Sequence, residues 1–121
     1  MDEGYGAWMK EQFPKMFTDQ RTDLNIGKGW WVIVESLCRG IQQYIDAVNK
    51  SKPDTVEQVV VTQVKEKFGT LRFYYTGGDA YVDGMVRMAG TWSSHCCEEC
   101  GDKGSMQNTG WIKTLCERHK K

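Results

Sequence analysis

Four residues near the C-terminus have the types and the spacing of a metal-binding site. They are Cys97, Cys100, Cys116 and His119, arranged as a Cys-x2-Cys pair, a segment over residues 101–115, and a Cys-x2-His pair. Three thiolates and one imidazole are the donors of closed tetrahedral zinc sites, in which no coordination position remains for water or substrate. The pattern therefore predicts that all four side chains bind one structural Zn²⁺ ion.

The cysteine count and the N-terminus favour metal binding over disulfide bonds. The chain has five cysteines, an odd number, and four of them lie in the last 26 residues. Residues 1–4 are acidic and polar and show no secretory signal. We therefore expect a cytoplasmic protein whose thiols are reduced.

Two residues beside the first pair leave its assignment open. His95 and Cys96 directly precede Cys97, and Cys96 with Cys100 would form a Cys-x3-Cys pair. That spacing is possible but less common in zinc knuckles, so we favour Cys97 as the ligand.

The residues around the two pairs predict the local backbone structure that carries each pair. Gly101 permits the tight turn of a zinc knuckle, and residues 104–111 are typical of a small hairpin with Gly110 in its turn. Thr114 is well placed to cap a short terminal helix that would carry Cys116 and His119 on one face. Knuckle, hairpin and helix in this order resemble a treble-clef zinc finger.

Catalysis by the metal is not expected. A zinc deaminase needs a His-x-Glu motif before its Cys-x2-Cys pair, but the histidines of this chain are His95 and His119 alone. The C-terminal segment also resembles treble-clef nucleases of the HNH type, which carry a catalytic histidine on the hairpin. Because residues 101–115 contain no histidine, we expect a protein that is not an enzyme.

The rest of the chain predicts two helices before a change of pattern. Apolar residues recur at intervals of three and four over residues 5–17, and a polar, glycine-bearing loop follows over residues 18–29. The strongest apolar stripe covers residues 30–48, and the helix that it predicts ends at Ser51-Lys52-Pro53.

Residues 56–76 then have the composition of strands. Residues 59–64 are rich in β-branched side chains and residues 71–75 alternate, so Gly69 is expected to supply the turn of a β-hairpin. Two strands alone are marginally stable, and the hairpin must pack on the long helix or find further strands. Asp79 can cap a third helix that leads into the knuckle.

These elements predict an α+β fold. We expect helices packed on a β-hairpin or a small antiparallel sheet, with a C-terminal treble-clef-like zinc finger. The chain is expected to form one domain over residues 1–121. Its parts are an N-terminal helix and loop (1–29), an α+β core (30–95) and a zinc-binding lobe (96–121).

Three sequence patterns occur together in the second half of the chain. They are the run Val64-Lys-Glu-Lys-Phe-Gly-Thr-Leu-Arg-Phe-Tyr-Tyr75, the Gly-Gly-Asp after it, and the tail Cys-Glu-x-Cys-Gly…Gly-Trp-x-x-Thr-Leu-Cys-x-x-His. Over most of residues 30–119 they resemble a family of small uncharacterised bacterial and phage proteins. The resemblance implies zinc ligation, with Cys97 rather than Cys96 as ligand, and a phage or prophage setting, but it implies no activity.

The hairpin carries a second group of candidate binding residues. They are Lys65, Lys67, Arg72 and Tyr74. Cations beside an aromatic ring can stack a base and pair with phosphate, as single-strand and nucleotide sites do. The same alternation is found in any half-buried hairpin, where the charges form a solvated face. Trp31, beside Trp30 on the long helix, is a candidate exposed anchor for a protein partner.

Charge and composition favour binding of a protein over binding of nucleic acid. Sixteen Lys and Arg balance sixteen Asp and Glu, which argues against a general polyanion binder, and five tryptophans suit protein contacts. We therefore predict a small non-enzymatic zinc-binding protein of phage or prophage type that binds a host protein. Nucleic-acid or nucleotide binding through the zinc lobe and the basic hairpin is the alternative. The longest apolar run, residues 30–34, is too short to cross a membrane.

Overall fold

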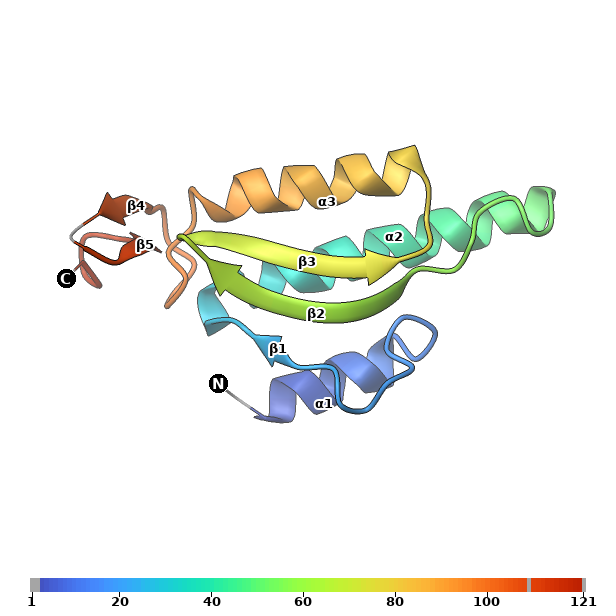
Figure 1. The fold of residues 1–121 in the computed structure, drawn as a ribbon, viewed down its shortest axis with the longest axis horizontal. Helices are drawn as coiled ribbons and strands as arrows, with labels where there is room; N and C mark the ends of the chain where they lie inside the picture. Colours follow the sequence, from blue (N-terminus) through green and yellow to red (C-terminus); the bar gives the residue numbers. More distant parts are fainter. Residues whose placement is uncertain (1–2, 109, 121) are drawn as a thin grey trace.

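The computed structural model describes residues 3–108 and 110–120 and has an α+β fold (Figure 1). Its elements are α1 (Glu3–Gln12), β1 (Leu24–Asn25), the 3₁₀ helix η1 (Lys28–Trp30), α2 (Trp31–Ser51), β2 (Val60–Lys67), β3 (Thr70–Thr76), α3 (Ala80–Ser93), β4 (Ser105–Asn108) and β5 (Ile112–Leu115). The predicted fold class is confirmed. Among the described helices, none is both long enough and apolar enough to span a membrane.

The larger sheet has three strands in the order β1-β2-β3. β2 and β3 form the predicted antiparallel hairpin, and both residues of its turn, Phe68 and Gly69, have positive φ, as a two-residue type I′ turn requires. β1 pairs with β2 in parallel, with Leu24 beside Val64. The expectation of a plain loop over residues 18–29 is therefore wrong, because a two-residue strand depends on its partner rather than on its own pattern.

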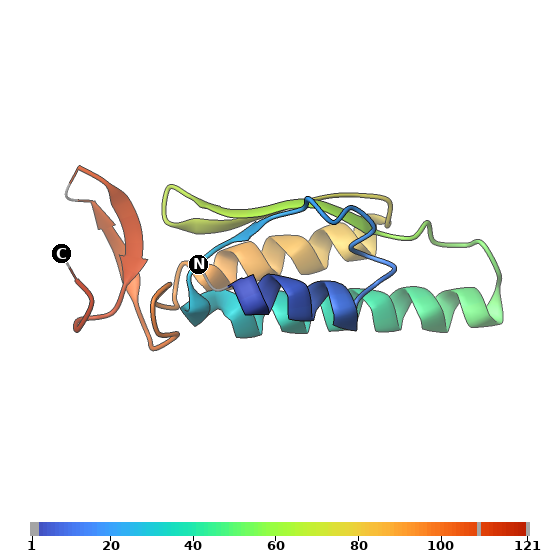
Figure 2. The same cartoon turned by 90° about the horizontal axis from the view of Figure 1, so that it is seen from below.

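The three α-helices lie on one face of this sheet, and no helix or strand of the described residues covers its other face, called the open face below (Figure 2). The inward side chains of β2 and β3 include Val64 and Phe73, which are buried against the helices. The N-terminal residues belong to the same core, because Met9 of α1 and Leu24 of β1 are almost fully buried in it.

The helix ends follow from their sequences. The first helix, predicted over residues 5–17, is shorter at its C-terminal end: α1 stops at Gln12, two residues before Pro14, whose ring cannot continue a helix. α2 ends at Ser51, as predicted. Asp79 caps α3, because its carboxylate accepts a hydrogen bond from the Val82 N–H (3.0 Å).

The C-terminal lobe lies at one end of the helix and sheet layers (Figure 1). Its β4–β5 hairpin is confirmed, with Met106 beside Thr114 and Gly110 at a φ of 96° in the connection. The terminal helix expected from a treble clef is wrong, since residues 117–119 form a turn. Thr114 does not cap a helix because it is buried in β5, where its hydroxyl donates to the Gly69 carbonyl (2.6 Å).

Candidate metal centre

The first ligand pair lies on a tight backbone turn between α3 and β4, residues 97–101, called the first turn below. The Gly101 N–H donates to the Cys97 carbonyl (2.8 Å), and the Cys97 N–H donates to the Asp102 carbonyl (2.7 Å). Gly101 has a φ of 86°, a left-handed value that glycine adopts at little cost. The backbone is therefore fixed at the first pair, as the predicted knuckle requires.

The second ligand pair lies directly after β5, on residues 116–119, called the second turn below. Leu115 of β5 pairs with Ser105 of β4, so strand pairing positions the chain just before Cys116. The His119 N–H donates to the Cys116 carbonyl (3.1 Å). A turn, instead of the expected helix, thus brings the cysteine and the histidine to the same side.

The four predicted ligand side chains converge. Their ligand atoms all lie within 4.8 Å of one another. The His119 Nδ1 is 3.3 Å from the Cys116 Sγ and 3.6 Å from the Cys97 Sγ. The Cys100 Sγ is 3.7 Å from the Cys116 Sγ.

These three distances are close to the edges of a metal tetrahedron. Bonds of about 2.3 Å to sulfur and about 2.0–2.1 Å to nitrogen give edges of about 3.8 Å between two sulfurs and about 3.6 Å between sulfur and nitrogen. All cysteines of the chain are free thiols, so no disulfide competes for the ligands. The cluster could therefore hold a metal ion.

The residues beside Cys97 lie outside this cluster. The Cys96 side chain packs against the main core, and its carbonyl accepts a hydrogen bond from the Trp30 Nε1 (2.8 Å). Burial raises the pKa of the Cys96 thiol, and the Trp92 side chain opposes this only in part. His95 also contributes no atom to the cluster. Of the alternatives left open by the sequence, the structure brings Cys97 to the other ligands.

Electrostatics within the cluster favour a thiolate at Cys116 but not at Cys100. A backbone hydrogen bond from Asp102 lowers the pKa of Cys100, but burial and the other two thiols of the cluster outweigh it, so the pKa of Cys100 is raised. Burial opposes ionisation of Cys116, but hydrogen bonds with the backbone and ring of His119 and with the neighbouring thiols outweigh it and lower the pKa of Cys116 to about 6. Arg118 adds a positive charge, with its Nη2 3.6 Å from the Cys100 Sγ, and it also pairs with Asp102. Deprotonated thiols are the form that binds a metal.

Sequence reasoning missed the segment that supports the first turn, residues 27–30. The Gly29 N–H donates to the Glu98 carbonyl (2.8 Å), and the Gly27 N–H donates to the Glu98 carboxylate (2.9 Å). A Cβ on Gly29 would lie 2.1 Å from the Cys97 carbonyl oxygen, so no other residue fits there without movement of the turn. The available signal was the presence of two glycines, Gly27 and Gly29, just before Trp30, since glycine permits such a close backbone approach.

A partly buried group of ion pairs also joins the lobe to the core. The Lys113 Nζ lies 3.0 Å from the Glu66 carboxylate and 3.7 Å from the Glu98 carboxylate. Burial raises the pKa of Glu98, while the Gly27 N–H and Lys113 act in the opposite direction. These side chains line a cleft of about 610 Å³ between β1, β2 and the lobe. Lys113 thus pairs with both carboxylates, and the Lys113–Glu66 ion pair links the lobe to β2.

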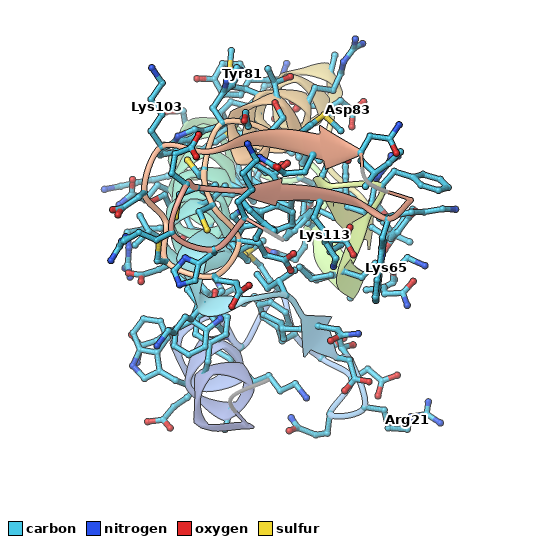
Figure 3. All side chains as sticks on the ribbon, turned by 90° about the vertical axis from the view of Figure 1, so that its left-hand side faces the viewer. Arg21, Lys65, Tyr81, Asp83, Lys103 and Lys113 are labelled. Carbon is cyan, nitrogen blue, oxygen red and sulfur yellow. The ribbon has the colours of Figure 1, made fainter. Side chains whose placement is uncertain are left out.

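The predicted hairpin residues lie on the open face of the sheet. They are Lys65, Lys67, Arg72 and Tyr74, and strand alternation points them away from the buried residues of the same strands. Lys65 is directly opposite Arg72, and its Nζ is 5.8 Å from the centre of the Tyr74 ring. Figure 3, which looks onto the lobe, shows Lys65 and Lys113 on the same side of the molecule.

Trp31 lies apart from these residues. Its ring is half-buried and stacks on Tyr5, with 4.3 Å between the ring centres. Trp30, its neighbour, is fully buried in the main core.

Comparisons of this chain with protein-family models, with curated proteins and with solved structures found no match. The resemblance to small bacterial and phage proteins therefore stays a prediction. The candidate site rests on its own geometry.

Proposed function

We propose that the chain is a non-enzymatic protein with one structural Zn²⁺ ion, and that it acts by binding a host protein. The observation that carries the metal assignment is the convergence of four ligand atoms within 4.8 Å. Three thiolates and an imidazole in tetrahedral spacing suit Zn²⁺ better than the oxygen-preferring ions Mg²⁺ and Ca²⁺. With four protein ligands the ion has no open position, which favours a structural role.

Metal analysis of protein purified without added zinc tests this assignment. We expect one zinc per wild-type chain and almost none in Cys116→Ser. Cys38→Ala is the matched control, because Cys38 is buried in the main core and is not part of the cluster. A wild-type protein that folds fully without any metal would end the proposal.

An apolar groove between α2 and α3 supports a protein partner. It has a volume of about 310 Å³ and is lined by Ile33, Ser36, Leu37, Met85, Met88, Ala89 and Trp92. Met88 is 66% exposed and Trp92 is 47% exposed, although both belong to the apolar face of α3. Exposed methionine and tryptophan side chains around an apolar groove are typical of protein-binding surfaces. The phage setting implied by the resemblance makes a host protein the expected partner.

Affinity capture from a nuclease-treated bacterial lysate tests the partner class. We expect wild type to retain a protein that Met88→Lys loses. Trp8→Lys, at an exposed aromatic residue of α1 outside the groove, is the control and should capture normally. Equal capture by Met88→Lys and wild type would exclude the groove, and capture that depends on nucleic acid would exclude a direct protein partner.

One observation favours nucleic acid as a second candidate ligand. Lys65 and Arg72 are directly opposite on the open face, where like charges destabilise a strand pair. The outward positions of β2 and β3 around them carry no carboxylate. A bound phosphate would remove this repulsion, and Tyr74 beside Lys65 offers a ring for base stacking.

Salt dependence separates this candidate from the first. Binding of a fluorescent oligothymidine should weaken steeply between about 50 and 200 mM salt. It should also weaken in Lys65→Glu, which introduces an attraction to Arg72 in place of the repulsion. No detectable binding at the lower salt concentration would exclude this candidate.

A further inference from the structure

β3 is an edge strand whose outward backbone groups are bonded to α3 at Leu71 but not at Phe73. The hairpin closes at the hydrogen-bonded pair Lys67–Thr70, so alternation directs the backbone N–H and C=O of Leu71 and Phe73 away from β2. The Leu71 N–H confirms this direction, because it donates to the Ser93 Oγ of α3 (2.9 Å). The Phe73 N–H, in contrast, donates no hydrogen bond to α3 or to any other part of residues 3–108 and 110–120.

A groove runs along this edge, between β3 and α3. Its volume is about 550 Å³, and its lining includes Thr70, Arg72, Tyr74, Arg87, Gly90 and Thr91. A Cβ on Gly90 would lie 3.6 Å from the Leu71 carbonyl oxygen, an ordinary contact distance, so packing does not require glycine there. Glycine inside a helix costs about 1 kcal/mol relative to alanine, and at this position it keeps the groove free of a side chain.

The charged side chains of the groove have one sign. Arg72 and Arg87 are in the lining, and none of the described residues that line the groove carries a carboxylate. The Arg72 Nε is buried and has no hydrogen-bond partner among the described residues. A buried guanidinium N–H without an acceptor is costly, and an acidic ligand group would satisfy it.

We infer that this groove binds an extended, acidic segment of a partner protein, which adds to β3 as a fourth strand. An edge strand beside a helix supplies both parts of such recognition: main-chain bonds to the strand and side-chain contacts to the groove. The Phe73 N–H and C=O pair with the incoming backbone, and acidic side chains of the segment reach Arg72 and Arg87. This inference rests on the proposed protein-binding function, and it adds a second contact surface, separate from the α2–α3 groove, together with the chemistry of the segment that it binds.

Peptide display tests the inference with a defined probe. A library of random dodecapeptides is selected on the zinc-loaded chain, with Gly90→Leu as the counter-selection. We expect enriched peptides to carry acidic residues. Binding of the best peptide should slow amide hydrogen exchange at Phe73.

Matched variants locate the binding. Gly90→Leu fills the groove and should weaken the selected peptide about tenfold or more, whereas Gly84→Leu, on the same helix with open space around it, should bind as wild type does. Arg87→Glu should also weaken binding about tenfold, independently of any effect of the leucine on folding.

Several results would overturn the inference. These are enrichment of neutral or basic peptides, equal binding to Gly90→Leu, unchanged exchange at Phe73, and displacement of the peptide by oligothymidine. None of these results would by itself exclude the proposed protein-binding function. A lysate protein captured equally well by wild type and Gly90→Leu would leave protein binding intact and remove only the β3 edge as its site.

Discussion

The two turns that carry the metal ligands are supported in different ways. The first turn is tied to the core by hydrogen bonds from Gly27, Gly29 and Trp30, and Cys97 is fully buried. The second turn follows β5, and its Arg118 pairs with Asp102 at the surface. The first turn therefore has a backbone scaffold of its own, whereas the second depends on the strand before it and on its ligands.

This difference indicates what the metal contributes. The main-chain bonds of the first turn do not involve the cysteine side chains, so they can form without an ion. The ion would then act mainly by fastening Cys116 and His119 to a preformed half-site. We expect metal removal to loosen the lobe unevenly instead of unfolding the whole chain.

Metal removal has the largest expected effect. Chelation of the bound zinc should lower the free energy of unfolding by roughly 5 kcal/mol, since structural zinc contributes on the order of 10 kcal/mol in small zinc-finger peptides. Amide exchange should rise first in residues 116–120 and less in residues 97–101. Equal acceleration in both turns would contradict the proposed difference between them.

A substitution at Gly29 tests the support of the first turn. Gly29→Ala places a methyl group 2.1 Å from the Cys97 carbonyl oxygen, so the turn must move. We expect a loss of about 3 kcal/mol in urea unfolding, together with weaker metal binding. Gly6→Ala is the control, because its Cβ meets nothing within 4 Å and alanine favours the helix. A stability equal to wild type would show that the segment does not constrain the turn.

The two adjacent tryptophans allow a narrower test. Trp30→Phe removes the Nε1 donor to the Cys96 carbonyl and leaves a small cavity, which should cost about 2–4 kcal/mol. Trp31→Phe removes an Nε1 that has no hydrogen-bond partner among the described residues, so its cost should be clearly smaller. Thermal unfolding of both variants measures the difference, and the reverse order would refute the role given to Trp30.

The exposed ion pair of the second turn should matter least. Asp102→Asn removes the partner of Arg118, and both side chains are more than half exposed. We expect a change below about 0.5 kcal/mol and no loss of metal, because surface ion pairs contribute little. A larger effect would mean that the second turn has more support of its own than we infer.

The sequence predicted the parts of the fold that have local signals. The α2 stripe, the β-branched hairpin and the Asp79 cap were sufficient to place the helices and the larger strands, and cysteine spacing was sufficient to select the four converging ligands.

Elements that depend on distant partners were not predicted. β1 is defined by its pairing with β2, and Gly29 is required by a turn almost seventy residues later in the chain. The terminal helix was predicted from Thr114 as a cap, but that hydroxyl bonds to the Gly69 carbonyl and keeps its residue in a strand. Local patterns cannot show such contacts.

X-ray absorption at the zinc edge of the purified protein tests the central claim most directly. We expect one zinc per chain with three sulfur neighbours at about 2.3 Å and one nitrogen neighbour at about 2.0–2.1 Å. The Cys97→Ser protein should lose this spectrum, and the Cys96→Ser protein should keep it. A folded wild type with no zinc, or with oxygen ligands in place of sulfur, would contradict the account.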